Sequence, residues 1–133
     1  MLDAIANTHT VIWYLYGHAS LSRKARAFIE ETVQAGGTIG ISGITLVEMV
    51  YLVEKGRLHK EALSRLIQHL DAGDSVFVDV PVDRDIAKIL PSIPWEDVPD
   101  MPDRIIAATA LYWDVPLITR DYRIRKTGIR IIW

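Results

Sequence analysis

Residues 5–13 of the chain read IANTHTVIW. The apolar run that begins at Leu2 is typical of a buried strand, and it stops at Asn7, where polar residues take over until Val11. In an open parallel sheet, ligands bind beyond the carboxyl ends of the strands. The stretch therefore predicts a first strand over residues 2–6, which places Asn7 at the ligand-binding edge of a sheet.

The rest of the sequence predicts helices that alternate with short strands. The predicted helices cover residues 21–33, 43–55, 63–70, 86–90 and 101–113, and the predicted strands cover residues 38–42, 76–80, 116–119 and 129–133. We expect Ser20, Ser42 and Asp100 to be helix N-caps, and the proline-rich residues 91–103 to form an irregular loop. Such alternation predicts an α/β fold around a mainly parallel sheet of four or five strands.

Length and composition indicate one globular domain over residues 1–133. Half of the residues are hydrophobic and 24% are charged, which is typical of folded domains. The absence of cysteine excludes disulfides, thiolate zinc sites and thiol nucleophiles. No apolar run approaches the ~20 residues that span a bilayer, and the first residues lack the basic start of a secretory signal. We therefore expect a cytoplasmic protein.

The positive charges gather near the C-terminus, although the net charge is only −2. This basic stripe holds one acid, Asp121, among five cationic residues: Arg120, Arg123, Arg125, Lys126 and Arg130. A local positive patch can attract phosphates even on a slightly acidic protein. A solvated surface face explains the same pattern equally well.

Four polar residues are expected at the same edge of the sheet. Asn7 follows the first strand, Glu48 lies early in the helix after the second, Asp103 begins the last long helix, and Asp121 follows a late strand. Helix-dipole stabilisation of about 0.3–1 kcal/mol could explain an acid such as Asp103 without any function, and Asp121 could be a turn former. Glu48 has apolar sequence neighbours, so it is either exposed or buried for a reason. Their joint placement favours a common site.

Five segments in order resemble PIN domains, and within them the VapC-type toxins of bacterial toxin–antitoxin pairs. They are NTHTVIW (7–13), SGITLVEM (42–49), DMPDRIIAATA (100–110), LITRD (117–121) and GIRIIW (128–133). The resemblance implies a three-layer α/β/α sandwich. It also implies a helix over residues 8–16, where periodicity alone leaves 10–16 open between strand and helix.

The resemblance implies a metal-dependent ribonuclease whose four acidic positions fall on Asn7, Glu48, Asp103 and Asp121. Oxygen ligands of this kind suit Mg²⁺ or Mn²⁺, and such an ion can activate a water and offset charge on a phosphate. Supporting roles are expected from four neighbours: Thr8, Thr119, Arg104 and Arg120. The two arginines could steady the substrate backbone or neutralise the acids as ion pairs. His9 could act as a general base, although packing or capping explains it as well.

The implied partners are an RNA substrate, a cognate antitoxin and a second copy of the chain in a homodimer. The candidate RNA-binding residues are Arg123, Arg125, Lys126 and Arg130.

Asn7 is the one departure from the acidic pattern. An amide has nearly the shape of a carboxylate but lacks its charge, so we expect weaker metal binding and impaired catalysis. Two explanations stay open: a deliberate change that silences a toxic enzyme, or divergence into a non-catalytic RNA- or protein-binding module.

Overall fold

The computed structural model describes all residues, 1–133, and its centre is a five-stranded parallel sheet. The strand order is β3-β2-β1-β4-β5. The strands are β1 (Ala4–Ala6), β2 (Ile39–Ser42), β3 (Phe77–Val80), β4 (Leu117–Ile118) and β5 (Ile131–Ile132). The predicted α/β fold around a parallel sheet is confirmed, with five strands.

Six α-helices and two short 3-10 helices connect the strands. They are α1 (Thr8–Tyr16), α2 (Arg23–Gln34), α3 (Gly43–Glu54), α4 (Lys60–Ala72), α5 (Arg84–Ile89), η1 (Leu90–Ser92), α6 (Met101–Trp113) and η2 (Tyr122–Thr127). The helix over residues 8–16 agrees with the resemblance. Three residues of the basic stripe, Arg123, Arg125 and Lys126, lie in η2, a helix that the sequence pattern did not predict. None of the helices has the length and apolar character needed to cross a membrane.

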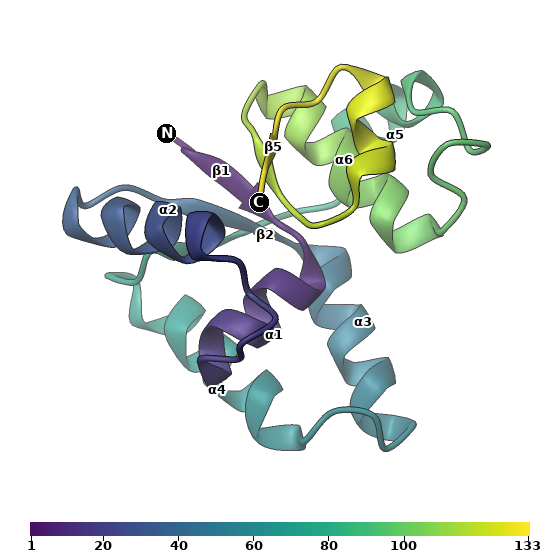
Figure 1. Cartoon of the computed structure of the whole chain (residues 1–133). Coiled ribbons are helices and arrows are strands. Elements are labelled where there is room, and N and C mark those ends of the chain that lie inside the picture. The colour runs from purple at the N-terminus through teal and green to yellow at the C-terminus, as the bar shows by residue number, and fades with distance from the viewer.

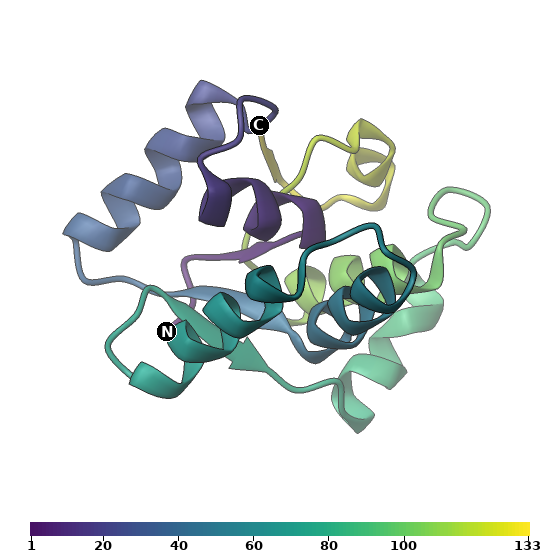
Figure 2. The same ribbon diagram turned by 90° about the horizontal axis from the view of Figure 1, so that it is seen from below.

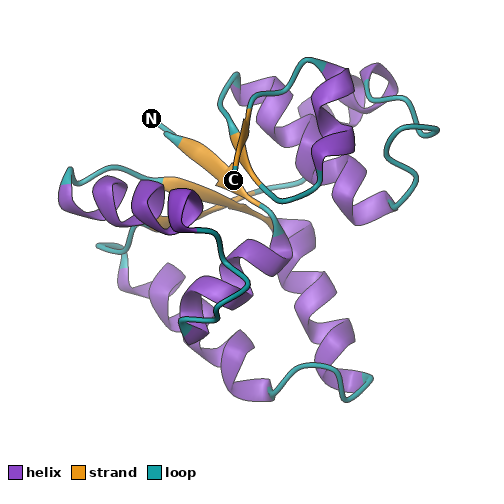
Figure 3. Cartoon of the chain, in the orientation of Figure 1, coloured by secondary structure: helices purple, strands orange, loops and turns teal.

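The helices cover both faces of the sheet, which gives three layers (Figures 1 and 3). One face packs against α1, α2 and α4 through residues such as Ile29, Leu66 and Phe77. The other face packs against α5, α6 and η2, and Ile106 lies in this second core. The view from below shows the same separation of the two groups of helices (Figure 2).

Local sequence explains where three of the helices begin. Ser42 Oγ accepts a hydrogen bond from the Ile44 backbone amide at 3.2 Å, and Asp100 Oδ1 accepts one from the Asp103 amide at 3.4 Å, as expected of N-caps. The predicted cap of α2 is wrong. Ser22, not Ser20, caps this helix, and its Oγ accepts from the Ala25 amide at 3.1 Å.

Candidate functional site

Asn7 lies at the centre of the candidate site, directly after β1. Since β1 and β4 are parallel neighbours, their carboxyl ends meet, and Asn7 Nδ2 donates a hydrogen bond to Thr119 Oγ1 at 3.2 Å. The Asn7 side chain is 1% exposed, and its Oδ1 has no hydrogen-bond partner. A buried polar atom without a partner costs free energy. Asn7 is therefore held in place from one side, with an acceptor left for another group.

Glu48 reaches the same region from α3. Thr8 Oγ1, in the first turn of α1, donates to Glu48 Oε1 at 2.6 Å and lies 3.0 Å from Thr45 Oγ1. Glu48 is half-buried, and burial raises the pKa of its carboxyl group, while the Thr8 hydroxyl opposes the rise. The sequence left open whether this acid is exposed or buried. The structure places it half-buried beside Asn7's neighbour, Thr8.

Asp103 lies in the first turn of α6, beyond the carboxyl end of the sheet. Burial raises its pKa to about 6, and the negative charges of Asp100, Glu48 and Asp121 add to the rise, while the neighbouring amide of Asn7 opposes it. These interactions need short separations. The structure thus brings the four predicted positions, from four separate elements, into one acidic edge of the molecule. Their catalytic and metal-binding roles stay predictions.

Asp121 differs from the other acids because a cation neutralises it. Arg123 Nε lies 3.1 Å from Asp121 Oδ1, and Arg123 Nη2 lies 3.1 Å from Oδ2, in the one salt bridge of the molecule. The hydrogen bond from Arg123 holds the pKa of Asp121 below its usual value. The Asp121 amide also donates to Thr119 Oγ1 at 3.2 Å, so Thr119 joins Asn7 to Asp121.

The oxygen donors of this edge have the chemistry that Mg²⁺ or Mn²⁺ prefers, and the unpartnered Asn7 Oδ1 offers a further neutral ligand. Even so, no three acidic or histidine side chains in the chain are placed to hold a metal ion together. Asn7 carries no charge, and Asp121 binds Arg123 in this arrangement. The donor set fits a hard cation, but it is incomplete in this arrangement.

The structure corrects one of the two roles expected of Arg104, that of an ion pair with the acids. Its Nε donates to the Ile93 carbonyl at 2.8 Å and its Nη2 to the Leu90 carbonyl at 3.1 Å. Arg104 therefore forms no ion pair with the acids and ties the residues after α5 to the first turns of α6, while its contact with substrate stays a prediction. A signal for this role was the proline-rich loop before α6, whose backbone carbonyls need donors.

Arg120 also forms no ion pair with the acids. Its guanidinium lies 4.8 Å from the centre of the Trp13 ring, and the side chain is exposed. Sequence reasoning missed this contact, and it also missed Thr45. The spacing of three residues between Thr45 and Glu48 could have revealed the latter, because residues at this spacing share one face of a helix.

His9 packs beside the acidic edge. Its ring centre lies 4.9 Å from that of Trp13, and its buried Nε2 has no hydrogen-bond partner. Burial lowers the pKa of His9 to about 4, helped by the charge of Arg120 and opposed by that of Asp121. The imidazole is therefore neutral at pH 7. The contact with Trp13 agrees with the packing role, and because a neutral imidazole can accept a proton, the role of general base stays a prediction.

The four predicted RNA-binding residues lie on or after η2, and all are exposed. Arg123 is bound to Asp121, Arg125 lies 4.5 Å from the centre of the Tyr122 ring, and Arg130 Nη2 donates to the Asp114 carbonyl at 3.2 Å. The stripe is thus partly committed to contacts within the protein, and its binding of RNA stays a prediction.

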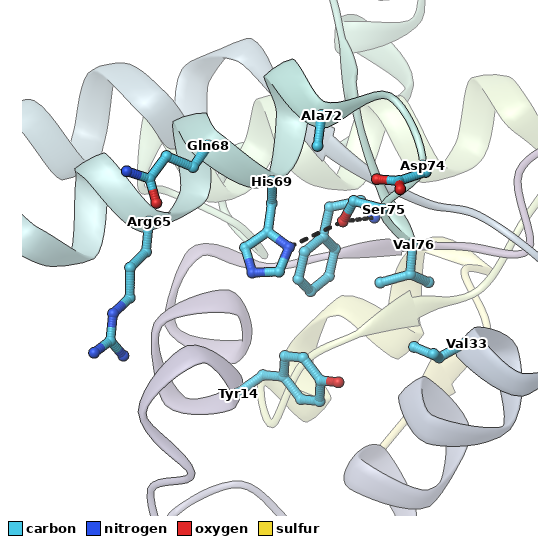
Figure 4. Close-up of a pocket in the computed structure, with 10 residues that line it drawn as sticks. Tyr14, Val33, Arg65, Gln68, His69, Ala72, Asp74, Ser75 and Val76 are labelled. Carbon is cyan, nitrogen blue, oxygen red and sulfur yellow. Dashed lines mark hydrogen bonds between the residues drawn. The ribbon is translucent and has the colours of Figure 1, made fainter.

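A cavity of about 550 Å³ lies elsewhere, where α1, α2, α4 and β3 meet. Figure 4 shows Tyr14, Arg65 and His69 around it, with His69 Nδ1 3.1 Å from Ser75 Oγ. None of the residues predicted for the site lines this cavity.

The model of the PIN domain family matches residues 5–129. None of the curated proteins matches the sequence.

Solved structures share the fold over nearly the whole chain. VapBC2 from Rickettsia felis, bound to a DNA fragment from its promoter, is 18% identical, with a TM-score of 0.72 over 98% of this chain and 97% of that one. A toxin–antitoxin complex from Klebsiella pneumoniae is 27% identical, with a TM-score of 0.59 over 90% and 89%. DNA-bound VapBC from Salmonella typhimurium is 22% identical, with a TM-score of 0.68 over 98% and 97%.

Proposed function

Because this chain belongs to the PIN domain family, we propose that it is a metal-dependent ribonuclease of the VapC type, present here in an impaired form. In this proposal it is the toxin of a toxin–antitoxin pair, and Asn7 occupies the first of four acidic positions. The alternative is a PIN-like module that binds RNA or protein without cleaving it.

One observation carries the proposal: four elements bring Glu48, Asp103 and Asp121 together around a buried amide with an unpartnered oxygen. A fold alone does not need this arrangement. An acid such as Asp103, whose pKa is raised by burial and by the charges of the neighbouring acids, costs stability at neutral pH, and strongly perturbed groups cluster at functional sites. An acidic edge that the fold does not require is best explained by a cation that it would hold.

In this proposal the residues of the acidic edge have different roles. Glu48, Asp103, Asp121 and the Asn7 carbonyl would hold the ion. When bound, a divalent ion supplies an activated water and offsets negative charge on a phosphate. Thr8 orients the Glu48 carboxylate through the 2.6 Å hydrogen bond, and Thr119 fixes Asn7 relative to β4. Substitution of an acid by Asn7 removes one of the negative charges on which this chemistry depends.

Similarity to toxin–antitoxin complexes supports an antitoxin as the protein partner. An acidic edge that is open to a phosphate backbone is also open to a cationic segment of a protein, which could inhibit the enzyme by covering it. A homodimer is part of the proposal, and α3 offers an exposed apolar face for it through Val47, Val50 and Tyr51.

The decisive variant is Asn7→Asp. We expect it to cleave single-stranded RNA in Mn²⁺ at least about a hundredfold faster than the parent chain, because loss of one preorganised electrostatic group typically costs about 10²–10³ in rate. The measurement is a time course of RNA fragments on a gel, with and without a chelator.

Two controls separate a restored site from a general charge effect. Adding Asp103→Asn to Asn7→Asp should remove the gained activity. Adding Asp79→Asn, at an exposed acid in β3, should leave it unchanged. If Asn7→Asp folds and binds Mn²⁺ but cleaves no RNA, the nuclease proposal is wrong and the binding module becomes the better explanation.

A further inference from the structure

Trp13, His18 and Arg120 lie in contact with one another's planar groups beside the acidic edge, with Trp13 between the other two in the contact network. The His18 and Trp13 rings stack with their centres 6.0 Å apart at an angle of 22°, and the Arg120 guanidinium lies 4.8 Å from the centre of the same indole. We refer to these three residues as the stacking surface. His18 and Arg120 are exposed, while Trp13 is half-buried beneath them.

The position of His18 is fixed by its backbone. Gly17 ends α1 in the left-handed conformation, with φ of 60°, and the His18 amide donates to the Trp13 carbonyl at 2.8 Å. The His18 ring is fixed as well, since its Nδ1 accepts a hydrogen bond from the Ser20 amide at 3.0 Å. An exposed ring that is held in this way loses little conformational entropy when a ligand stacks on it.

The indole beneath is anchored by two further rings. His9 lies 4.9 Å from Trp13 and Trp133 lies 6.0 Å from it, between ring centres, and both are half-buried. The stacking surface therefore rests on the core and does not depend on a mobile side chain.

The stacking surface adjoins the acidic edge directly. Arg120 stands in the chain between Thr119, which binds Asn7, and Asp121. From the other side, His9 packs on Trp13 and follows Thr8, which binds Glu48. A strand of RNA whose phosphate lay at the acids would have a neighbouring base within reach of these rings.

Arg120 has no acidic partner, because the one salt bridge of the molecule joins Arg123 to Asp121. Its guanidinium carbon instead lies over the Trp13 ring, 4.8 Å from the ring centre. Unpaired bases stack on aromatic rings and on arginine planes of this kind, whereas paired bases within a duplex are not available for such contacts.

We propose that the stacking surface binds an unpaired nucleobase of RNA next to the phosphate at the acidic edge. This inference rests on the proposed function. It makes Trp13, His18 and Arg120 determinants of RNA binding and of base preference, distinct from the predicted metal ligands.

The test uses the chain with Asn7 in place, so that binding is measured without cleavage. The probes are a fluorescent single-stranded RNA and a strand of the same length in which abasic residues replace the central bases, both followed by anisotropy. We expect His18→Ala and Arg120→Lys each to weaken binding of the complete RNA about tenfold, at the lower end of the effect of base stacking, and to change binding of the abasic strand little.

Two matched variants separate stacking from charge and from general damage. His18→Phe keeps a flat ring and should bind the complete RNA as the parent does. Lys88→Gln removes an exposed charge on α5, an element that does not contribute to the stacking surface. This variant should weaken binding of the complete and the abasic RNA equally and only slightly. Arg120→Lys keeps the charge but not the plane, so its loss of binding reports stacking.

Two results overturn the inference: unchanged binding in His18→Ala and Arg120→Lys, or equal weakening with complete and abasic RNA, which would mean that charge alone acts. These outcomes are distinguishable from failure of the proposed function. If Asn7→Asp cleaves RNA while the two variants bind like the parent, only the stacking surface is wrong. If Asn7→Asp cleaves no RNA and the parent binds none, both are wrong.

Discussion

The acidic edge and the large cavity lie in different parts of the molecule and differ in almost every physical respect. The cavity has a volume of about 550 Å³ and carries satisfied polar groups, such as the Ser75 hydroxyl, which contacts His69 and accepts from the Phe77 amide at 3.2 Å. The acidic edge is not among the main cavities. Yet it holds both of the buried side-chain atoms in the molecule that have no hydrogen-bond partner, Asn7 Oδ1 and His9 Nε2.

The difference shows that volume and chemistry need not coincide in one small domain. A cavity marks where helices pack imperfectly, and its walls stabilise the fold through buried apolar contacts. Unpartnered polar atoms and mutually repelling acids cost stability, so their presence at one edge points to a ligand. The two regions should therefore respond oppositely to substitution.

The largest effect is expected at the wall of the cavity, in Phe77→Ala. Phe77 is 2% exposed, and its ring packs against those of Tyr14 and His69 with centres 5.7 and 6.1 Å apart. Removing it should lower the free energy of unfolding by about 3–5 kcal/mol, as measured by urea denaturation. Placed in the Asn7→Asp background, it should leave RNA cleavage per folded molecule unchanged. A selective loss of cleavage would mean that the two regions are coupled.

An intermediate effect of the opposite sign is expected at the acidic edge, in Asp103→Asn. The folded-state pKa of about 6 lies above the ordinary value of 3.8, so the charged form is disfavoured by folding. The contribution of Asp103 to the free energy of unfolding is thus fully present below pH 3.8, and it is lost as the pH rises through 6. At pH 8 the variant should be more stable than the parent by about 1–2 kcal/mol, after allowance for partial solvent exposure.

Urea denaturation at pH 8 and near pH 4 tests this prediction. Near pH 4 the parent and the variant should have the same free energy of unfolding. Asp79→Asn, at an exposed acid of β3, is the control and should change stability at neither pH. If Asp103→Asn lowered the free energy of unfolding at pH 8, the charged acid would be stabilised by its contacts within the protein. Its presence would then need no functional explanation.

The smallest effect is expected from Ser75→Ala, again at the cavity. The variant loses the contact with His69 Nδ1 and leaves the Phe77 amide without its side-chain acceptor. We expect a loss of about 1 kcal/mol in the free energy of unfolding and no change of RNA cleavage in the Asn7→Asp background. Ser64→Ala, where an exposed hydroxyl donates to the Lys60 carbonyl within α4, is the matched control and should cost less.

Much of the fold could be predicted because its signals are local. Apolar periodicity and caps such as Ser42 and Asp100 marked the helices, and alternation with short strands indicated a parallel sheet. The exceptions have physical reasons. Residues 10–16 are rich in β-formers and still form α1, since burial of Val11 against the core outweighs local preference. The cap at Ser22 was missed because Ser20 is equally suitable in sequence.

The sequence by itself determined which residues stand at the carboxyl ends of the strands, because each strand ends where its local apolar pattern ends. Only the tertiary structure decided their state: Asp121 bound to Arg123, Arg104 turned to the backbone after α5, and Arg120 laid on Trp13. Each of these outcomes depends on which partner a flexible charged side chain finds in space. The Arg120 contact joins elements far apart in the chain, whereas Asp121 and Arg123 are only two residues apart. In both cases the pairing depends on side-chain distances and burial that the sequence does not state.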